Sequence, residues 1–306
     1  MTVSEALAEL VRTNPELQET ASFVAALYDE IGNVPLDPFF EPPSTIFLKK
    51  DGKELRELVG VRAQDLTSWT RHISASTLCR MRAVEEPIIE NLVAGRTLAT
   101  MVLLRGHFEA AAMAAYCLER LTEAARQDQP NALNDLIPKT LFGTALKKHS
   151  DKGLIADLPT KSHVSLKGLT DIKADTIRIC DAVESLDRFY YQEAAAGKLG
   201  IVYSLLCEFA HPNHRGVRDF MQAVDRDDGW LISYTKEEPA NAAMQVHAVE
   251  TLLVSMRSGY SAGEMLRCWR FSQQDSSRVD WHWPSVDDGA RVWKHFLQRP
   301  IGGSVA

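Results

Sequence analysis

The run of residues 96–125, RTLATMVLLRGHFEAAAMAAYCLERLTEAA, constrains the fold more than any other part of the chain. It is rich in Ala, Leu and Met and contains no Pro, so it predicts one long helix. Nearly every side chain in its middle is apolar or small, and a helix that is apolar on all sides is buried. The length would also suit a membrane span, but Arg105, His107 and Glu109 would be costly in hydrocarbon. We therefore expect a buried central helix and no membrane partner.

Polar residues on this central helix allow two interpretations. Arg105 and Glu109 are four residues apart, share one face and can form an ion pair, whereas His107 lies about 200° around the axis from Arg105. Buried charges are rare unless they are paired or hydrogen-bonded. The pair is therefore either a structural lock between helices or part of a polar pocket, and the helix alone leaves both interpretations open.

The rest of the chain predicts further helices, and the expected fold class is an all-α multi-helix bundle. Helical patterns cover residues 3–31, 53–94, 170–190, 198–211 and 239–269. We expect at most one short β element, near residues 230–234, and a short amphipathic helix over residues 285–298. The expected regions are an N-terminal helical region (1–94), a core bundle domain (95–270) and a C-terminal tail (271–306).

Two segments lack a clear helical period. Residues 33–52 contain four prolines and several aromatic residues, which fits either a loop packed on the main body or an arm that grips a partner. Residues 128–168 mix Pro, Gly, Asn and Lys and are the most basic part of the chain. A solvated surface and an anion-attracting surface are both compatible with that composition.

Charge and cysteine content narrow the class of protein. The formal net charge is −7, so a generally basic surface is not expected, although a local basic patch is compatible with this charge. The N-terminus has neither the basic nor the apolar region of a signal peptide. The five cysteines are scattered without a CxxC motif, and we expect them to be reduced core thiols. These features predict a cytoplasmic location.

Further polar residues lie on two other apolar helices. Ser204, Glu208 and His211 are four and three residues apart, so they share one face of the helix expected at 198–211. Pro212 ends that helix and places three more polar residues on the following turn: Asn213, His214 and Arg215. The helix at 239–269 carries His247, Glu250 and Arg257 near one face. In a bundle such groups can converge in the core, where helical proteins build sites.

Known catalytic motifs are mostly missing from the sequence. Glu208-x-x-His211 has the spacing found in carboxylate di-iron bundles, but His247-x-x-Glu250 has the reverse order and two further glutamates are lacking. A carboxylate–histidine metal site is therefore a lesser alternative, and no cofactor is expected. The absence of GxSxG, P-loop, GxGxxG and HExxH motifs disfavours the familiar hydrolase, nucleotide-binding and zinc-protease classes.

Two motifs resemble those of a bacterial all-helical family known as a domain of unknown function. LLRGHFEAAAMAAY resembles its Arg-x-x-x-Glu helix, and VYSLLCEFAHPN resembles its Tyr-x-x-Leu-Ser-Glu-x-x-His-Pro motif, with Cys207 where Ser is common. The resemblance covers residues 95–257 and implies polar positions at Arg105, Glu109, Tyr203, Glu208, His211 and Asn213. That family is loosely similar to the HEPN superfamily, which includes metal-independent RNases of toxin and defence systems. The Arg-x(4–6)-His motif of those RNases does not occur in this sequence.

Two main functional hypotheses follow. In the first, the chain has a buried polar pocket that binds or acts on nucleic acid in a defence or toxin-type role, with catalytic residues Arg105, Glu109, Glu208 and His211. Its expected binding residues are Tyr203, Asn213, His214, Arg215 and His247. In the second, the chain is a non-catalytic interaction protein in which the same residues only lock the helices together. The partners considered are a second copy, forming a homodimer, and nucleic acid, and the sequence leaves catalysis undecided.

Overall fold

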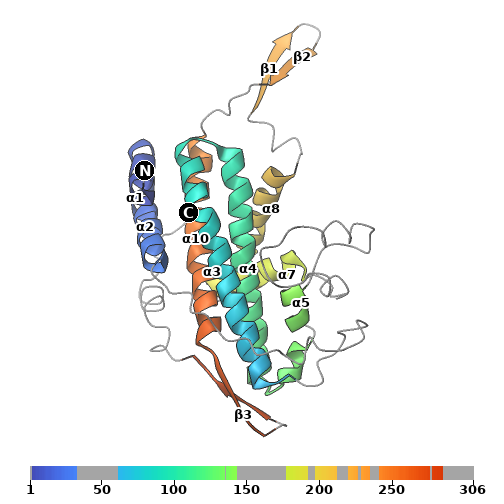
Figure 1. Cartoon of the computed structure of the whole chain (residues 1–306). Coiled ribbons are helices and arrows are strands. Elements are labelled where there is room, and N and C mark those ends of the chain that lie inside the picture. The colour runs from blue at the N-terminus through green and yellow to red at the C-terminus, as the bar shows by residue number, and fades with distance from the viewer. Residues whose placement is uncertain are drawn as a thin grey trace, which may run out of the picture.

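The computed structural model describes residues 2–32, 61–134, 136–142, 177–191, 197–211, 220–226, 229–234, 241–275 and 278–284. Within these residues most of the chain is helical, which confirms the predicted all-α class (Figure 1). The loop of residues 33–52, the short helix expected over 285–298 and most of the basic segment 128–168 lie outside the described residues. The same holds for three predicted binding residues: Asn213, His214 and Arg215.

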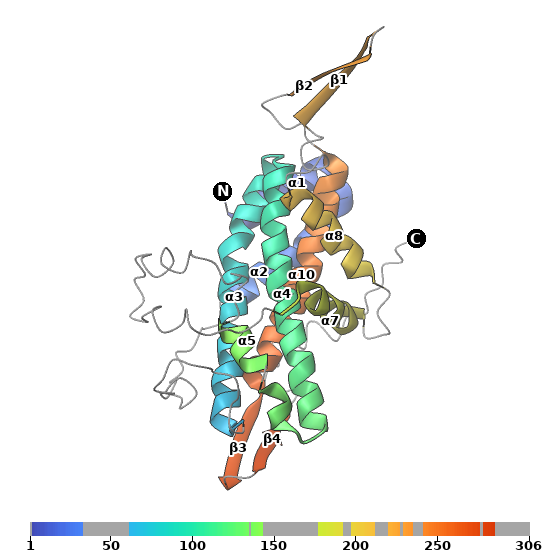
Figure 2. The ribbon, with the colours of Figure 1, turned by 90° about the vertical axis from the view of Figure 1, so that its right-hand side faces the viewer.

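Three long helices form the bundle: α3 (Ala63–Val93), α4 (Thr97–Arg126) and α10 (Ala242–Cys268). Figures 1 and 2 show them side by side along the long axis of the molecule. α3 and α4 are joined by a tight turn at Gly95, whose φ of 69° lies in the left-handed region that glycine adopts without steric cost. None of the described helices combines the length and the apolar character needed to cross a membrane.

α4 is the central helix of the bundle, as the sequence predicts. It packs on α3, α10, α7 (Ile179–Tyr191) and α8 (Lys198–Ala210). Its buried small side chains include Ala110, Ala111, Ala112, Ala114 and Ala115. The backbone of α10 comes close at Gly259, where an added Cβ would lie 2.8 Å from the Cβ of Ala111. No atom lies within 4 Å of a Cβ built on Gly106, so the close approach is centred on Ala111 instead.

Hydrogen bonds to helix ends fix the position of α8. The buried carboxylate of Asp187, on α7, accepts from the backbone N–H of Gly197 at 2.9 Å and of Leu199 at 3.0 Å. The first amides of a helix have no partner within that helix, so a carboxylate placed there satisfies them and is favoured by the helix dipole. These two hydrogen bonds therefore cap the N-terminus of α8 and join this helix to α7.

Shorter helices pack against the sides of the long helices (Figure 1). α1 (Val3–Thr13), the 3-10 turn Pro15–Leu17 and α2 (Gln18–Gly32) form one layer, in which α1 packs on α3 and α2 packs on α10. After α4, the 3-10 turn Pro130–Leu133 leads to α5 (Leu136–Phe142). There the hydroxyl of Thr140 accepts from the indole N–H of Trp69, on α3, at 2.7 Å, which ties α5 to the bundle.

Two antiparallel hairpins lie at opposite ends of the bundle (Figures 1 and 2). β1 (Met221–Arg226) pairs with β2 (Gly229–Tyr234), and β2 coincides with the short β element predicted at 230–234. β3 (Arg270–Asp275) pairs with β4 (Arg278–His282), which goes beyond the single β element expected. Trp269 anchors this second hairpin, because its ring lies 5.9 Å from Phe271 and 6.3 Å from Trp281.

The cysteines correct one expectation from the sequence. Cys117 and Cys268 are buried, and burial raises the pKa of the Cys117 thiol. Cys79 and Cys180, however, are exposed on the outer faces of their helices, so the prediction of core thiols is wrong for these two. An apolar sequence neighbourhood does not fix which face of a helix a single residue occupies.

Candidate functional site

Three of the predicted polar residues meet where α8 packs on α4, and we call them the Arg–Glu–Tyr cluster. The Nε of Arg105 donates to Oε1 of Glu109 at 2.9 Å, which confirms the predicted i, i+4 pair. The hydroxyl of Tyr203 donates to the same Glu109 oxygen, also at 2.9 Å. The Arg105 guanidinium carbon lies 5.8 Å from the centre of the Tyr203 ring, within the range of a cation–π contact.

The cluster lies at the edge of the core. The side chains of Arg105 and Glu109 are 26% and 24% exposed, whereas Tyr203 is buried and stacks on Phe108 with ring centroids 6.2 Å apart. Burial raises the pKa of Tyr203, and hydrogen bonds with Cys207 and Glu109 raise it further, so the phenol stays protonated and can donate. Burial alone would lower the pKa of Arg105, but its hydrogen bonds with Glu109 and Tyr203 outweigh burial and raise it.

The other two predicted catalytic residues are not brought to this cluster. Glu208 is half-buried on α8, five residues after Tyr203, and five residues rotate a helix by about 140° beyond one full turn. His211 is exposed immediately after Ala210, the last residue of α8. Among the described residues of the predicted site, Tyr203 is therefore the one that a separate helix brings to the Arg105–Glu109 pair.

The remaining predicted binding residue, His247, belongs to α10, a helix that contributes nothing to the cluster. Its side chain is half-buried, and its Nε2 atom is enclosed without a hydrogen-bond partner among the residues that the structure describes. Asn213, His214 and Arg215 lie outside the described residues, so their predicted roles stay predictions.

A second polar group, the buried quartet, joins α3, α4 and α10 and consists of Glu85, His107, Ser255 and Tyr260. The Nδ1 of His107 lies 2.6 Å from the Ser255 hydroxyl, and its Nε2 lies 3.1 Å from Oε1 of Glu85. The Tyr260 hydroxyl donates to the same Glu85 oxygen at 2.5 Å. A carboxylate oxygen accepts hydrogen bonds, so the His107 tautomer that donates from Nε2 to Glu85 leaves Nδ1 to accept from the Ser255 hydroxyl.

The quartet is sealed from solvent. No member is more than 1% exposed, and burial together with the nearby Glu85 charge raises the pKa of Tyr260. Ser255, His107 and Glu85 follow the nucleophile–base–acid order of a hydrolytic triad. A triad serine must reach its substrate, however, and Ser255 has no exposed surface. A hydrogen-bonded polar network in a core instead specifies how helices pack against one another.

Sequence reasoning found only His107 of this quartet. A signal for Glu85 was present, because it falls on the same stripe of α3 as the buried residues Met81, Ile88 and Leu92. A carboxylate on an apolar stripe needs a buried partner. Ser255 gave no comparable signal, because a single hydroxyl does not interrupt an apolar pattern.

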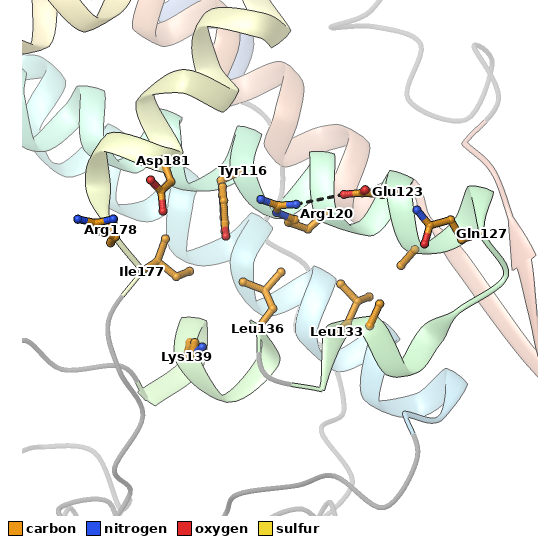
Figure 3. A pocket seen from close by; sticks show the side chains of 12 residues that line it. Tyr116, Arg120, Glu123, Gln127, Leu133, Leu136, Lys139, Ile177, Arg178 and Asp181 are labelled. Carbon is orange, nitrogen blue, oxygen red and sulfur yellow. Dashed lines mark hydrogen bonds and ion pairs between the residues drawn. The ribbon is translucent and has the colours of Figure 1, made fainter.

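The described residues also line a cavity of about 500 Å³ between α4, α5 and the start of α7 (Figure 3). At its wall Arg120 forms an ion pair with Glu123 at 3.1 Å and lies 5.2 Å from the centre of the Tyr116 ring. None of the predicted site residues lines it. Residues 143–176 join α5 to Ile177 at this wall and lie outside the described residues, so we assign the cavity no ligand.

Replacing Tyr203 by phenylalanine should lower the free energy of unfolding by about 1 kcal/mol, because Glu109 loses a hydrogen bond in a partly buried position. The same substitution in a Glu109→Gln background should cost less, since the charged acceptor is already gone. Urea denaturation followed by circular dichroism measures both effects. A Tyr203→Phe variant that unfolds at the same or a higher urea concentration would show that the cluster is not a structural lock.

The described residues contain no group of three or more His, Cys, Asp or Glu side chains arranged to hold a metal ion. No family model, no curated protein and no solved structure matches this chain. The chain's own residues are therefore the basis on which its function is inferred.

Proposed function

We propose that this chain is a non-catalytic interaction protein, in which the helical bundle is a rigid support and the hairpin of β1 and β2 is the binding element. The observation that carries the proposal is the position of the hairpin, beyond the end of the bundle (Figures 1 and 2). Three large apolar side chains on it, Val224, Leu231 and Ile232, are between 44% and 53% exposed.

Among the described residues, the hairpin adds little to the cohesion of the bundle. β1 and β2 pack chiefly against each other, and the described residues of the main core all come from outside them. Single exposed apolar residues are normal, but here Val224 and Leu231 are exposed opposite each other on one face of the hairpin, and Ile232 is exposed on the other face. A projecting element with such side chains is therefore better explained by a partner than by folding.

Both polar groups of the bundle support a non-catalytic role. In the Arg–Glu–Tyr cluster, Arg105 and Tyr203 both donate to Glu109, so the cluster is closed on itself and ties α4 to α8. In the buried quartet, His107 and Ser255 are sealed from solvent. A catalytic role would need a base or a nucleophile that a substrate can reach. Among the described residues, neither the Arg–Glu–Tyr cluster nor the buried quartet provides one.

A photo-cross-linking amino acid in place of Leu231 tests the proposal in cells that produce the full chain. We expect irradiation to give one discrete adduct of defined mass, because a bound partner lies against the hairpin. The matched control carries the same amino acid in place of Val102, which is 45% exposed against 44% for Leu231 but lies on the bundle. Equal adducts from both positions, or none from Leu231, would rule out the hairpin as the binding element.

A nucleic-acid-directed role is the competing hypothesis, and it predicts a different result. Under that hypothesis the purified chain binds or cleaves single-stranded RNA, and Arg105→Gln abolishes this while leaving the melting temperature nearly unchanged. Under our proposal the wild-type chain neither binds nor cleaves the RNA in a way that depends on Arg105. Fluorescence anisotropy with labelled RNA, followed by gel analysis of the same samples, separates the two.

A further inference from the structure

We propose that the partner bound by the hairpin is a second copy of this chain, and that the two copies pair β2 against β2 to form one four-stranded antiparallel sheet. This inference rests on the proposed function and names its partner. It follows from three features of the hairpin: a free strand edge, a marginal two-stranded fold, and a charge pattern that differs between β1 and β2.

The free edge is the first feature. β1 and β2 form a sheet of two strands in the described structure, with β1 paired antiparallel along the whole of β2, from Gly229 to Tyr234. Among the described residues, each strand therefore has one outer edge that is not paired with a third strand. Such edges are templates for pairing with another strand, and proteins recognise extended segments by adding a strand in this way.

The marginal stability of the hairpin is the second feature. An isolated two-stranded hairpin is barely stable in water, and a third strand or a covering helix is normally needed. β1 and β2 have neither in the described residues, since they pack chiefly against each other. Leu231 and Val224 lie directly opposite each other across the pair and remain half-exposed. Pairing with further strands would supply the missing backbone bonds and neighbours for these side chains.

The charge pattern is the third feature, and it points to β2 and to a second copy. β2 has the sequence GWLISY, with no charged residue, no proline and several residues that favour strands. β1 ends in the charged pair Asp225 and Arg226. Natural sheets protect an outer edge with charges, so β1 fits an outer edge and β2 fits an inner one.

Antiparallel pairing of β2 with its own copy is self-complementary. A two-fold axis through the strand brings each residue opposite another residue of the same neutral set, so no like charges meet. The outer edge of β2 in each copy is then paired with β2 of the other copy. The two β1 strands, which carry the charges, become the outer edges of the four-stranded sheet. The arrangement is closed, which explains why association would stop at a dimer and not continue into a filament.

The mass of the native particle, measured by sedimentation over a wide concentration range, tests the inference on the full chain. We expect the wild type to form a dimer. Ile232→Lys and Ile232→Glu should each weaken the dimer by roughly tenfold or more, because like charges then face each other near the two-fold axis. An equal mixture of the two variants should recover the dimer, since lysine from one copy then meets glutamate from the other. Val224→Lys is the control for Ile232→Lys, because Val224 is similarly exposed but lies on β1.

Each result decides the inference. A wild-type chain that remains monomeric, Ile232 variants that keep the dimer, or mixed variants that fail to recover it would each overturn pairing through β2. Recovery on mixing cannot come from a variant that has merely unfolded its hairpin. The identity of the Leu231 cross-link distinguishes the two proposals: an adduct with a different protein removes the dimer and keeps the interaction function, whereas the absence of an adduct removes both.

Discussion

Replacing His107 by alanine should lower the free energy of unfolding by roughly 3–5 kcal/mol. The substitution leaves the Glu85 carboxylate in the core with Tyr260 as its remaining partner in the quartet, and it also leaves Ser255 without its acceptor. Removing the hydrogen-bond partner of a buried carboxylate costs far more than removing the partner of an exposed one, because the buried group that remains cannot be solvated. The melting temperature should fall by on the order of 10 °C for a chain of this size.

The control for this experiment lies on the same helix. Arg105→Ala removes an ion pair that is about one-quarter exposed, and it should cost about 1 kcal/mol or less. Adding Glu85→Gln to His107→Ala should recover part of the loss, because the unpaired carboxylate is then gone. A melting temperature for His107→Ala that matches that of Arg105→Ala would mean that the buried quartet contributes little to holding α3, α4 and α10 together.

The fold class could be predicted from the sequence because one local pattern dominates it. Nearly every side chain in the middle of the run at 96–125 is apolar or small, and a largely buried α4 follows from that pattern. The hairpin of β3 and β4 could not be predicted in the same way. Its strands are short, and its position depends on the packing of Trp281 on Trp269, which is a contact between separated parts of the chain. Short strands held mainly by such contacts leave a weak periodic signal in the sequence.

In the candidate site, too, contacts between residues close in the sequence could be predicted, and contacts between distant residues could not. The pairing of Arg105 with Glu109 is a helical i, i+4 contact, so spacing alone predicts it. The partners of His107 are 22 residues away at Glu85 and 148 residues away at Ser255. Spacing carries no information over such separations. The sequence also predicts that Glu208 meets Arg105, but the spacing of residues on α8 does not show which face of that helix packs on α4.

Replacing Gly259 by alanine should also destabilise the chain, by about 1–3 kcal/mol, even though alanine is the better helix former. The added Cβ would lie 2.6 Å from the Met81 sulfur and 2.8 Å from the Cβ of Ala111. The Met81 side chain is fully buried and the Ala111 Cβ is fixed to its backbone, so neither can move away without disturbing the core. Thermal and urea unfolding of the full chain measure the effect.

Gly263, one turn further along α10, provides a matched control for this prediction. The nearest atoms to a Cβ at that position are 3.8 Å away, which is an ordinary contact, so Gly263→Ala should be neutral or stabilising by up to about 1 kcal/mol. Adding Ala111→Gly to Gly259→Ala should cost less than the sum of the two single changes, because the closest backbone-fixed contact is relieved. Equal effects at Gly259 and Gly263 would contradict a close approach between α10 and α4. A loss of stability at Gly259 but not at Gly263, which Ala111→Gly reduces, would confirm that α10 and α4 pack closely at Gly259 and Ala111. This contact lies next to the buried quartet, because Gly259 precedes Tyr260 and Ala111 lies one turn after His107.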